Sequence, residues 1–216
     1  MVPIVSIVGS SGSGKTTLLV KVISELVARG YRVATLKHDA HRFEIDKEGK
    51  DSWRHKQAGS CTVAISSKEK FAVIKDVSSE WPPERIIWSY LSDADIVITE
   101  GYKTSWFPKI EVVRKEHNPK PICAKDPSLI GYVSDVSLKT KKPIYKLNDF
   151  KGIATLIEKE VLKKHTLAEL SIIVDGASVP LNGFSGSIIK EAVSGMVRTL
   201  KGCAGAKEIE LRIKLK

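Results

Sequence analysis

The segment Gly-Ser-Ser-Gly-Ser-Gly-Lys-Thr-Thr at residues 9–17 constrains this chain more than any other feature. It satisfies the pattern Gly-x-x-x-x-Gly-Lys-[Ser/Thr] of a phosphate-binding P-loop. The apolar, β-branched run at residues 2–8 predicts a buried parallel strand before it. After it, apolar residues recur at helical spacing as far as Leu26, and Gly30 is placed to end the helix. Because a P-loop needs this strand and helix, we prefer it to a glycine-rich turn that happens to contain a lysine.

Each residue type in the P-loop has a physical role in holding phosphate. Glycines and small residues let successive backbone N–H groups curl around a phosphate, and the following helix presents the positive end of its dipole. Lys15 is predicted to reach the β- and γ-phosphates, and the Thr16 hydroxyl is predicted to ligate Mg²⁺. The predicted nucleotide-binding residues are Gly9, Ser11, Gly12, Ser13, Gly14, Lys15, Thr16 and Thr17.

A P-loop protein also needs a carboxylate near Mg²⁺ and a group that positions the attacking atom. Glu100 ends the apolar run at residues 95–100, and Asp39 follows a second strand candidate at residues 32–36. Open α/β sheets bind ligands at the carboxyl ends of their strands, so we expect both carboxylates to approach the metal. The alternatives are a solvated strand-end charge for Glu100 and an Asx turn for Asp39. The predicted catalytic residues are Lys15, Asp39 and Glu100, and the predicted metal ligands are Thr16, Asp39 and Glu100.

Composition narrows the class of protein without choosing a function. The 216 residues, 42% hydrophobic and 28% charged, fit one α/β domain or one domain with a small appendage. The net charge of +10 favours an anionic partner such as a nucleotide, a nucleic acid, an acidic protein or a membrane surface. The three cysteines are far apart, which disfavours a disulfide framework or zinc ribbon and favours a reducing cytoplasm. No apolar run approaches the roughly 18 residues of a spanning helix, so we expect no membrane segment.

The predicted elements alternate between strand and helix to about residue 165. They predict a mostly parallel sheet flanked by helices, an α/β fold of the P-loop NTPase type, over residues 1–165. From about Leu170 the pattern changes to two short strands, a helix at residues 185–200 and an alternating strand at residues 209–213. We therefore predict a small C-terminal β-β-α-β appendage of unknown role over residues 170–216.

The histidines that follow the second strand candidate raise the question of metal binding. His38 and His41 are three residues apart, with His55 and Cys61 further along the chain. Loop histidines are more often hydrogen-bonded or phosphate-contacting groups, and the sequence shows no pattern of residues that would hydrogen-bond and orient metal-binding histidines. We therefore favour a hydrogen-bonded or phosphate-contacting role over a transition-metal site.

A second group of motifs resembles one protein family. The motifs are Leu-Lys-His-Asp-Ala-His at 36–41, Phe-Glu-Ile-Asp at 43–46, Gly-Lys-Asp-Ser at 49–52, Ala-Gly at 58–59, Asp-Ile-Val-Ile-Thr-Glu-Gly-Tyr-Lys at 95–103 and Pro-Lys-Ile-Glu-Val-Val-Arg at 108–114. A P-loop alone is generic, but this ordered set is specific. Over about residues 1–165 the chain resembles molybdopterin-guanine dinucleotide biosynthesis protein B, the MobB family.

The resemblance implies a GTP-binding, Mg²⁺-dependent P-loop protein related to the metallochaperone GTPases. It implies a cytoplasmic homodimer with weak intrinsic GTPase activity. It also implies two partners, the molybdopterin guanylyltransferase that attaches GMP to molybdopterin, and molybdopterin or its guanine dinucleotide. A candidate groove for this second ligand would be lined by Lys37, His38, His41, Lys50, Asp51, Lys103 and Lys109. For Lys103 and Lys109 the alternative is an exposed, solvated lysine.

Some choices stay open at the level of sequence. The guanine-reading Asn-Lys-x-Asp motif is absent, so GTP over ATP rests on the resemblance, with Lys125-Asp126, Asp135 and Asn148-Asp149 as weak candidates for reading the base. A small-molecule P-loop kinase is one alternative, but it needs an arginine-bearing lid that is not evident. A nickel or other metal-insertion GTPase chaperone is another. Nucleic-acid binding is disfavoured because the lysines are dispersed and lack interleaved aromatic residues.

Overall fold

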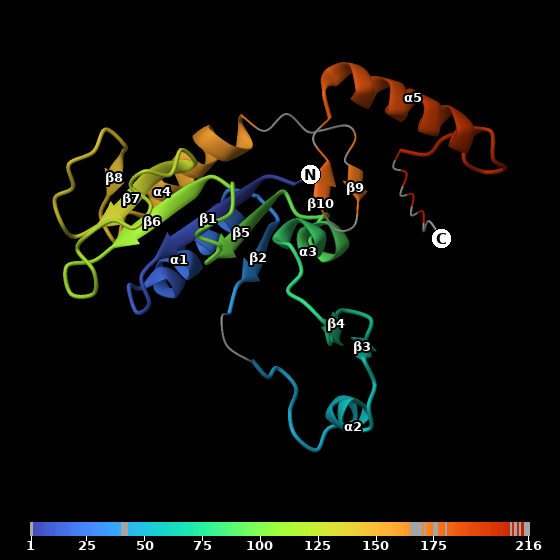
Figure 1. Ribbon diagram of the computed structural model, residues 1–216, viewed down its shortest axis with the longest axis horizontal. Coiled ribbons are helices and arrows are strands. Elements are labelled where there is room, and N and C mark those ends of the chain that lie inside the picture. Colours follow the sequence, from blue (N-terminus) through green and yellow to red (C-terminus); the bar gives the residue numbers. More distant parts are fainter. Residues whose placement is uncertain are drawn as a thin grey trace. The chain divides into compact units, whose positions relative to one another are not determined.

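The computed structural model describes residues 2–39, 43–164, 170, 172–174, 177–179, 181–207, 209, 211 and 213. These residues belong to two compact units, Val2–His165 and Thr166–Lys216. Figure 1 draws the chain from blue at the N-terminus to red at the C-terminus. Within the described part, no helix is both long and apolar enough to cross a membrane.

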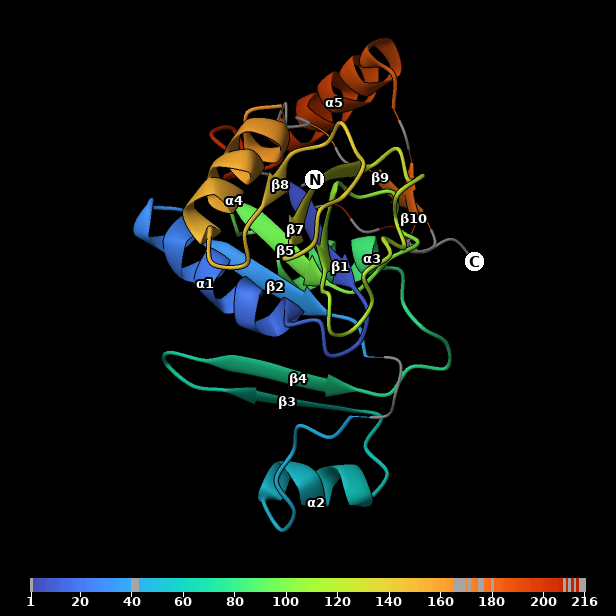
Figure 2. The same ribbon diagram turned by 90° about the vertical axis from the view of Figure 1, so that its left-hand side faces the viewer.

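A six-stranded sheet forms the centre of the first unit, and every neighbouring pair of its strands is parallel (Figures 1 and 2). The strand order is β2-β5-β1-β6-β7-β8. The strands are β1 (Ile4–Gly9), β2 (Val33–Lys37), β5 (Ile96–Glu100), β6 (Lys109–Val113), β7 (Leu129–Ser134) and β8 (Ile144–Tyr145). The chain runs to β2 and β5 on one side of β1 and to β6 on the other. The carboxyl end of β1 therefore lies at a topological switch point, where such sheets bind ligands.

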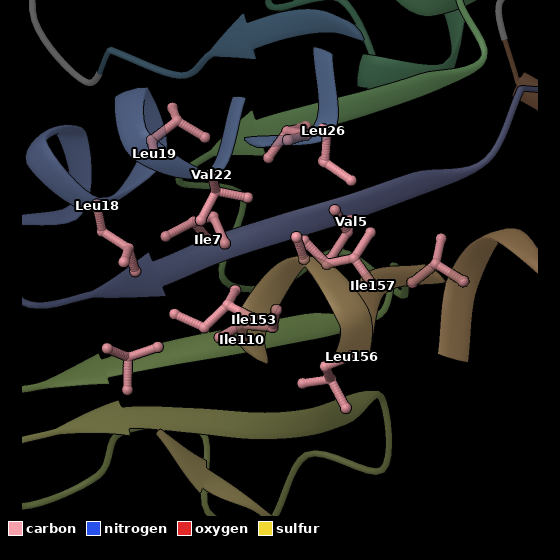
Figure 3. Packing of buried hydrophobic residues seen from close by; sticks show 14 of the residues in the cluster. Val5, Ile7, Leu18, Leu19, Val22, Leu26, Ile110, Ile153, Leu156 and Ile157 are labelled. Carbon is pink, nitrogen blue, oxygen red and sulfur yellow. The ribbon is translucent and has the colours of Figure 1, made fainter. Parts of the chain in front are cut away.

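Two helices, α1 (Lys15–Ala28) and α4 (Phe150–Ile157), pack together on one face of this sheet, and the π-helical segment η1 (Glu158–Leu162) continues α4. Figure 3 shows their apolar side chains meeting those of the strands beneath. The buried core on this face is Val5, Ile7, Leu18, Leu19, Val22, Leu26, Ile96, Ile98, Ile110, Val112, Val133, Ile153, Ala154, Leu156, Ile157 and Val161. This packing fixes the start of α1 beside the end of β1 and confirms the predicted P-loop fold class.

Local sequence explains where these helices begin and end. Gly14, with φ 84°, directly precedes α1, and Gly30, with φ 96°, follows it. Both values lie in the left-handed region that glycine adopts at little cost. The backbone N–H of Tyr31 then donates to the carbonyl of Leu26 at 3.1 Å, which closes the end of the helix. At α4, the Asp149 carboxylate caps the first turn by accepting the N–H of Gly152 at 3.0 Å.

The opposite face of the sheet has a smaller core and a buried carboxylate. Its core residues are Val8, Val113, Cys123, Leu129 and Tyr132. Glu111 in β6 is 1% exposed and accepts the backbone N–H groups of Ile122 at 2.6 Å and Cys123 at 3.0 Å. Burial raises the pKa of Glu111 against the opposing effect of these two bonds. The bend at residues 122–123 is thus fastened to the sheet.

Between β2 and β5 the chain forms a helix, a hairpin and a second helix. Helix α2 (Asp51–Gln57) precedes β3 (Thr62–Ser66), which pairs antiparallel with β4 (Phe71–Lys75), and α3 (Pro83–Tyr90) follows. Lys56 of α2 ties the helix to the hairpin, because its ammonium donates to the carbonyl of Ser60 at 2.9 Å and pairs with the carboxylate of Asp76. Pro83 begins α3, at a position where a missing N–H costs nothing.

The second unit contains a hairpin and a helix. Strand β9 (Ile172–Val174) pairs antiparallel with β10 (Ala177–Val179), and α5 (Gly183–Arg198) follows. Asn182 caps α5 by accepting the N–H of Ser185 at 2.8 Å. The predicted last strand at residues 209–213 lies partly outside the described residues, and residues 209, 211 and 213 have no strand pairing. The described part of the appendage is therefore β-β-α.

Candidate functional site

The P-loop connects β1 to α1 at the switch point, and its shape depends on glycine. Gly9, Gly12 and Gly14 have φ values of 149°, 72° and 84°, which side-chain-bearing residues rarely adopt. At Gly9 the requirement is also steric, because an added Cβ would lie 2.6 Å from the carbonyl oxygen of Val112. The loop therefore keeps the curled backbone that phosphate binding needs.

Two polar groups of the loop fit an anionic ligand. The Ser13 side chain is 0% exposed, and its hydroxyl has no hydrogen-bond partner among the described residues. A buried hydroxyl left unpaired costs free energy, and a phosphate oxygen or a water would supply the missing acceptor. The Lys15 ammonium donates to the carbonyl of Ser10 at 2.7 Å, so it folds back over the loop.

Thr16 and Glu100, two of the predicted metal ligands, lie in direct contact. The Thr16 hydroxyl lies 2.9 Å from Oε1 and 3.0 Å from Oε2 of Glu100. Glu100 is the last residue of β5, only 9% exposed, and lies beside Ile7 of β1 and Lys37 of β2 in the sheet. A hydroxyl and a carboxylate at the mouth of a P-loop are the oxygen ligands that Mg²⁺ takes together with phosphate. These donors therefore fit the ion.

Asp39, the third predicted metal ligand, follows the end of β2. Its carboxylate pairs with Lys37 at 3.7 Å, and Lys37 lies beside Glu100 in the parallel register of β2 and β5. This places Asp39 at the same end of the sheet as Glu100. Its contact with a metal stays a prediction.

Positive charge gathers around Lys15. The pKa of Lys15 is lowered, first because the ammonium is partly buried; Glu100 opposes this shift, and the charges of Lys103 and Lys37 add to it. An anion in the loop would relieve this repulsion, so the electrostatics favour a phosphate ligand.

The remaining members of the candidate groove lie apart from these contacts. Lys50 lies directly before α2 and makes no side-chain capping bond, and Asp51 is the first residue of the helix; both are exposed. Their place in a ligand groove stays a prediction. His41 lies outside the described residues.

His38 contacts an acidic and aromatic group beyond the end of β5. Its Nε2 lies 2.9 Å from Oε1 of Glu80, and its ring centroid lies 5.0 Å from that of Tyr102. Tyr102 has φ 52°, and burial, followed by the charges of Glu80 and Glu84, raises its pKa to about 12. No three His, Cys, Asp or Glu side chains within the described ranges gather closely enough to hold a metal ion. These contacts orient His38 at the edge of the site.

Lys109 is not a groove residue, and this prediction was wrong. Its side chain is 0% exposed, and its ammonium lies 3.0 Å from the carboxylate of Asp126 and 2.7 Å from the hydroxyl of Ser128. It also donates to the backbone carbonyls of Ser105 and Phe107. The physical reason is the packing around the start of β6, an interior strand between β1 and β7: residues 105–107, just before this strand, and residues 126–128, just before β7, surround the ammonium.

The three aspartates among the weak candidates for reading a base have structural contacts. Asp126 holds Lys109, and Asp149 caps α4. Asp135, just after β7, accepts Nε of Arg114 and the backbone N–H of Lys115, each at 2.8 Å. None of these contacts singles out guanine.

Sequence reasoning missed two residues that lie against the P-loop. A Cβ on Gly14 would meet Nη1 of Arg114 at 3.4 Å, and a Cβ on Gly12 would meet the ring of His117 at 3.1 Å. Arg114 ends one of the family-like motifs, and its place just beyond a strand of the sheet was the available signal. His117 follows in a turn and gave no signal.

Comparisons with known proteins agree with this geometry. A family model described as molybdopterin guanine dinucleotide synthesis protein B, MobB, matches residues 4–135. A molybdopterin-guanine dinucleotide biosynthesis adapter protein of Haemophilus influenzae is 37% identical over 163 residues, which cover 73% of this chain and 88% of the relative. A protein of the same description from Escherichia coli is 31% identical over 173 residues, covering 76% of this chain and 97% of the relative.

A solved structure supports the same relationship. A crystal structure of molybdopterin-guanine biosynthesis protein B matches with a TM-score of 0.58 and 34% identity, covering 72% of this chain and 97% of that one. The matched residues 4–135 include the P-loop, Glu100 and Arg114. The resemblance seen in the motifs is confirmed, and the chain belongs to the MobB family, the molybdopterin guanine dinucleotide synthesis proteins B.

Proposed function

We propose that this chain is a GTP-binding adapter protein in molybdopterin guanine dinucleotide biosynthesis. In this role it assists the guanylyltransferase that attaches GMP to molybdopterin, and it hydrolyses GTP only slowly by itself. The observation that carries the proposal is the contact of Thr16 with Glu100 beside a P-loop, in a chain of the MobB family. A cytoplasmic homodimer belongs to the same proposal and rests on the family resemblance.

Different residues of the site would bind different parts of the nucleotide and its metal ion. The loop's backbone N–H groups and the start of α1 would bind the phosphates, and Lys15 would turn from Ser10 toward the β- and γ-phosphates. Thr16 and Glu100 would hold Mg²⁺, with Asp39 as a further candidate. When bound, Mg²⁺ supplies positive charge to the β- and γ-phosphate oxygens.

Slow turnover is expected because hydrolysis needs more than these contacts. It needs a positioned water and a second cation at the γ-phosphate, and an arginine supplied by a partner raises P-loop hydrolysis by about 10³ to 10⁵. In this proposal the state with bound GTP engages the transferase or its pterin ligand. Rapid hydrolysis by the isolated chain would contradict it.

Glu100→Gln is expected to weaken GTP binding only when Mg²⁺ is present. The amide keeps the size and one acceptor oxygen but loses the charge that attracts the ion, so we expect the Mg²⁺-dependent gain in affinity to fall by at least about 10-fold. Calorimetric titrations with Mg²⁺ and with EDTA measure this gain. Glu69→Gln, in the exposed turn after β3, is the matched control. An unchanged Mg²⁺ effect in Glu100→Gln would remove Glu100 from the metal site.

A reconstituted reaction tests the adapter role. Purified guanylyltransferase, molybdopterin, GTP and Mg²⁺ are incubated with and without this chain, and the dinucleotide formed is measured over time. We expect the intact chain to raise the yield or rate and Lys15→Ala to lose this effect. Equal product formation with and without the chain would contradict the role in GMP attachment.

A further inference from the structure

Arg114 lies against the P-loop on the side away from the predicted metal ligands. It follows β6 directly, and its Nη1 lies 3.4 Å from the position that a Cβ on Gly14 would take. Glu100 ends β5, and β1 runs between β5 and β6. The carboxylate and the guanidinium therefore flank the loop from opposite sides.

One hydrogen bond holds the guanidinium in this place, and two further bonds fix the turn that follows it. Asp135, just beyond β7, accepts Nε of Arg114 at 2.8 Å, and its other oxygen accepts the backbone N–H of Lys115 at 2.8 Å. The N–H of Asn118 donates to the carbonyl of Arg114 at 3.0 Å, which closes the turn. With Nε bonded to Asp135, the two Nη groups carry four further N–H donors. The arginine is thus oriented before any ligand arrives.

The positive charges around Arg114 favour the binding of an anion. Gly14 is the N-cap of α1, where the helix dipole is positive, and Lys15 follows it. The positive end of this dipole repels a guanidinium beside it, and the ion pair with Asp135 opposes that repulsion. The buried Ser13 hydroxyl, without a partner among the described residues, is an independent sign of a missing ligand atom. A phosphate chain would satisfy both features.

We propose that Arg114 binds the α- and β-phosphates of the nucleotide and that Asp135 positions it. This inference rests on the proposed nucleotide site and names a further residue of it. Backbone N–H groups of a P-loop cradle the α- and β-phosphates, so a guanidinium against Gly14 faces that part of the chain. The γ-phosphate and Mg²⁺ belong to the side of Thr16 and Glu100. Arg114 therefore contributes to binding of both GDP and GTP.

The test compares two nucleotides in one variant. Arg114→Ala is expected to lower the affinity for GDP and for GTP by the same factor, roughly 10- to 100-fold, because both nucleotides have the α- and β-phosphates. Arg32→Ala is the matched control: Arg32 also pairs with an aspartate, Asp95 at 3.2 Å, but at the amino end of the sheet. Its affinities should equal those of the wild type.

The other outcomes are equally informative. If Arg114→Ala weakened the binding of GTP but not of GDP, the contact would be with the γ-phosphate and the assignment would be overturned. Unchanged affinity for both nucleotides would remove Arg114 from the site. If Arg114→Ala unfolds, Arg114→Lys gives the same comparison with the positive charge retained but the planar fork lost, and we expect a smaller equal loss for both nucleotides. Wild-type protein that binds no GTP would instead refute the proposed function.

A double-mutant cycle tests the positioning by Asp135. Asp135→Ala should weaken GDP and GTP equally, and it should add little further loss in an Arg114→Ala background because both variants remove one interaction. Asp135→Asn keeps an acceptor oxygen for Nε and should recover much of the affinity. Fully additive losses in the double variant, or no recovery with asparagine, would contradict positioning through Arg114.

Discussion

Lys15→Ala is expected to abolish tight binding of GTP and leave the fold intact. The lysine supplies the charge that reaches the β- and γ-phosphates, and its loss should weaken GTP by at least about 100-fold. Stability should not fall, because the pKa of Lys15 is lowered: burial, Lys103 and Lys37 disfavour the ammonium more than Glu100 favours it. The empty site is therefore no less stable without this charge.

Calorimetry and thermal unfolding separate these two effects. Lys21→Ala is the matched control, because Lys21 is an exposed lysine on the same helix, α1. We expect Lys21→Ala to bind GTP as the wild type does and both variants to unfold within a few degrees of it. Wild-type GTP affinity in Lys15→Ala would refute the P-loop assignment.

Lys109→Met is expected to destabilise the protein. The ammonium is fully buried and held by Asp126, Ser128 and two backbone carbonyls, so methionine leaves several acceptors without a donor. Breaking a buried pair costs about 3 to 5 kcal/mol, and the low end applies because Asp126 is partly exposed to water. For a chain of this size, about 3 kcal/mol lowers Tm by roughly 6 to 12 °C.

Lys103→Ala is expected to affect nucleotide binding and not stability, the reverse of Lys109→Met. Lys103 is exposed, and its charge acts on Lys15. We expect Lys103→Ala to unfold as the wild type does but to bind GTP more weakly, because one positive charge near the phosphates is lost. If Lys109→Met unfolded at the wild-type temperature, the structural role given to Lys109 would be wrong.

The parts predicted from sequence are those fixed by local pattern. A strand, a glycine loop and a helix in immediate succession leave few alternatives, so β1, the P-loop and α1 followed from residues 2–30. Glu100 was found because an apolar run that ends in a carboxylate predicts a strand end at the ligand edge of the sheet. The contact of Glu100 with Thr16, 84 residues away in sequence, could not be predicted, because it depends on the register of β1 against β5.

The parts that sequence reasoning missed depend on strand order. Lys109 was predicted to line a ligand groove, with an exposed lysine as the alternative, and only the place of β6 inside the sheet, with residues 105–107 and 126–128 around its first residue, shows that it is buried. Arg114 was missed because its place also depends on strand order. Strand β6 lies next to β1, and this adjacency places the Arg114 side chain against Gly14. No periodicity or spacing encodes that adjacency.

Titration of the purified wild-type chain with GTP tests the central claim most directly. Isothermal calorimetry in the presence of Mg²⁺ is expected to show saturable binding of one GTP per chain, weaker in EDTA and weaker for ATP. Binding of GTP that does not saturate, or that is equal with and without Mg²⁺, would contradict the account of the P-loop, Thr16 and Glu100 as a GTP site.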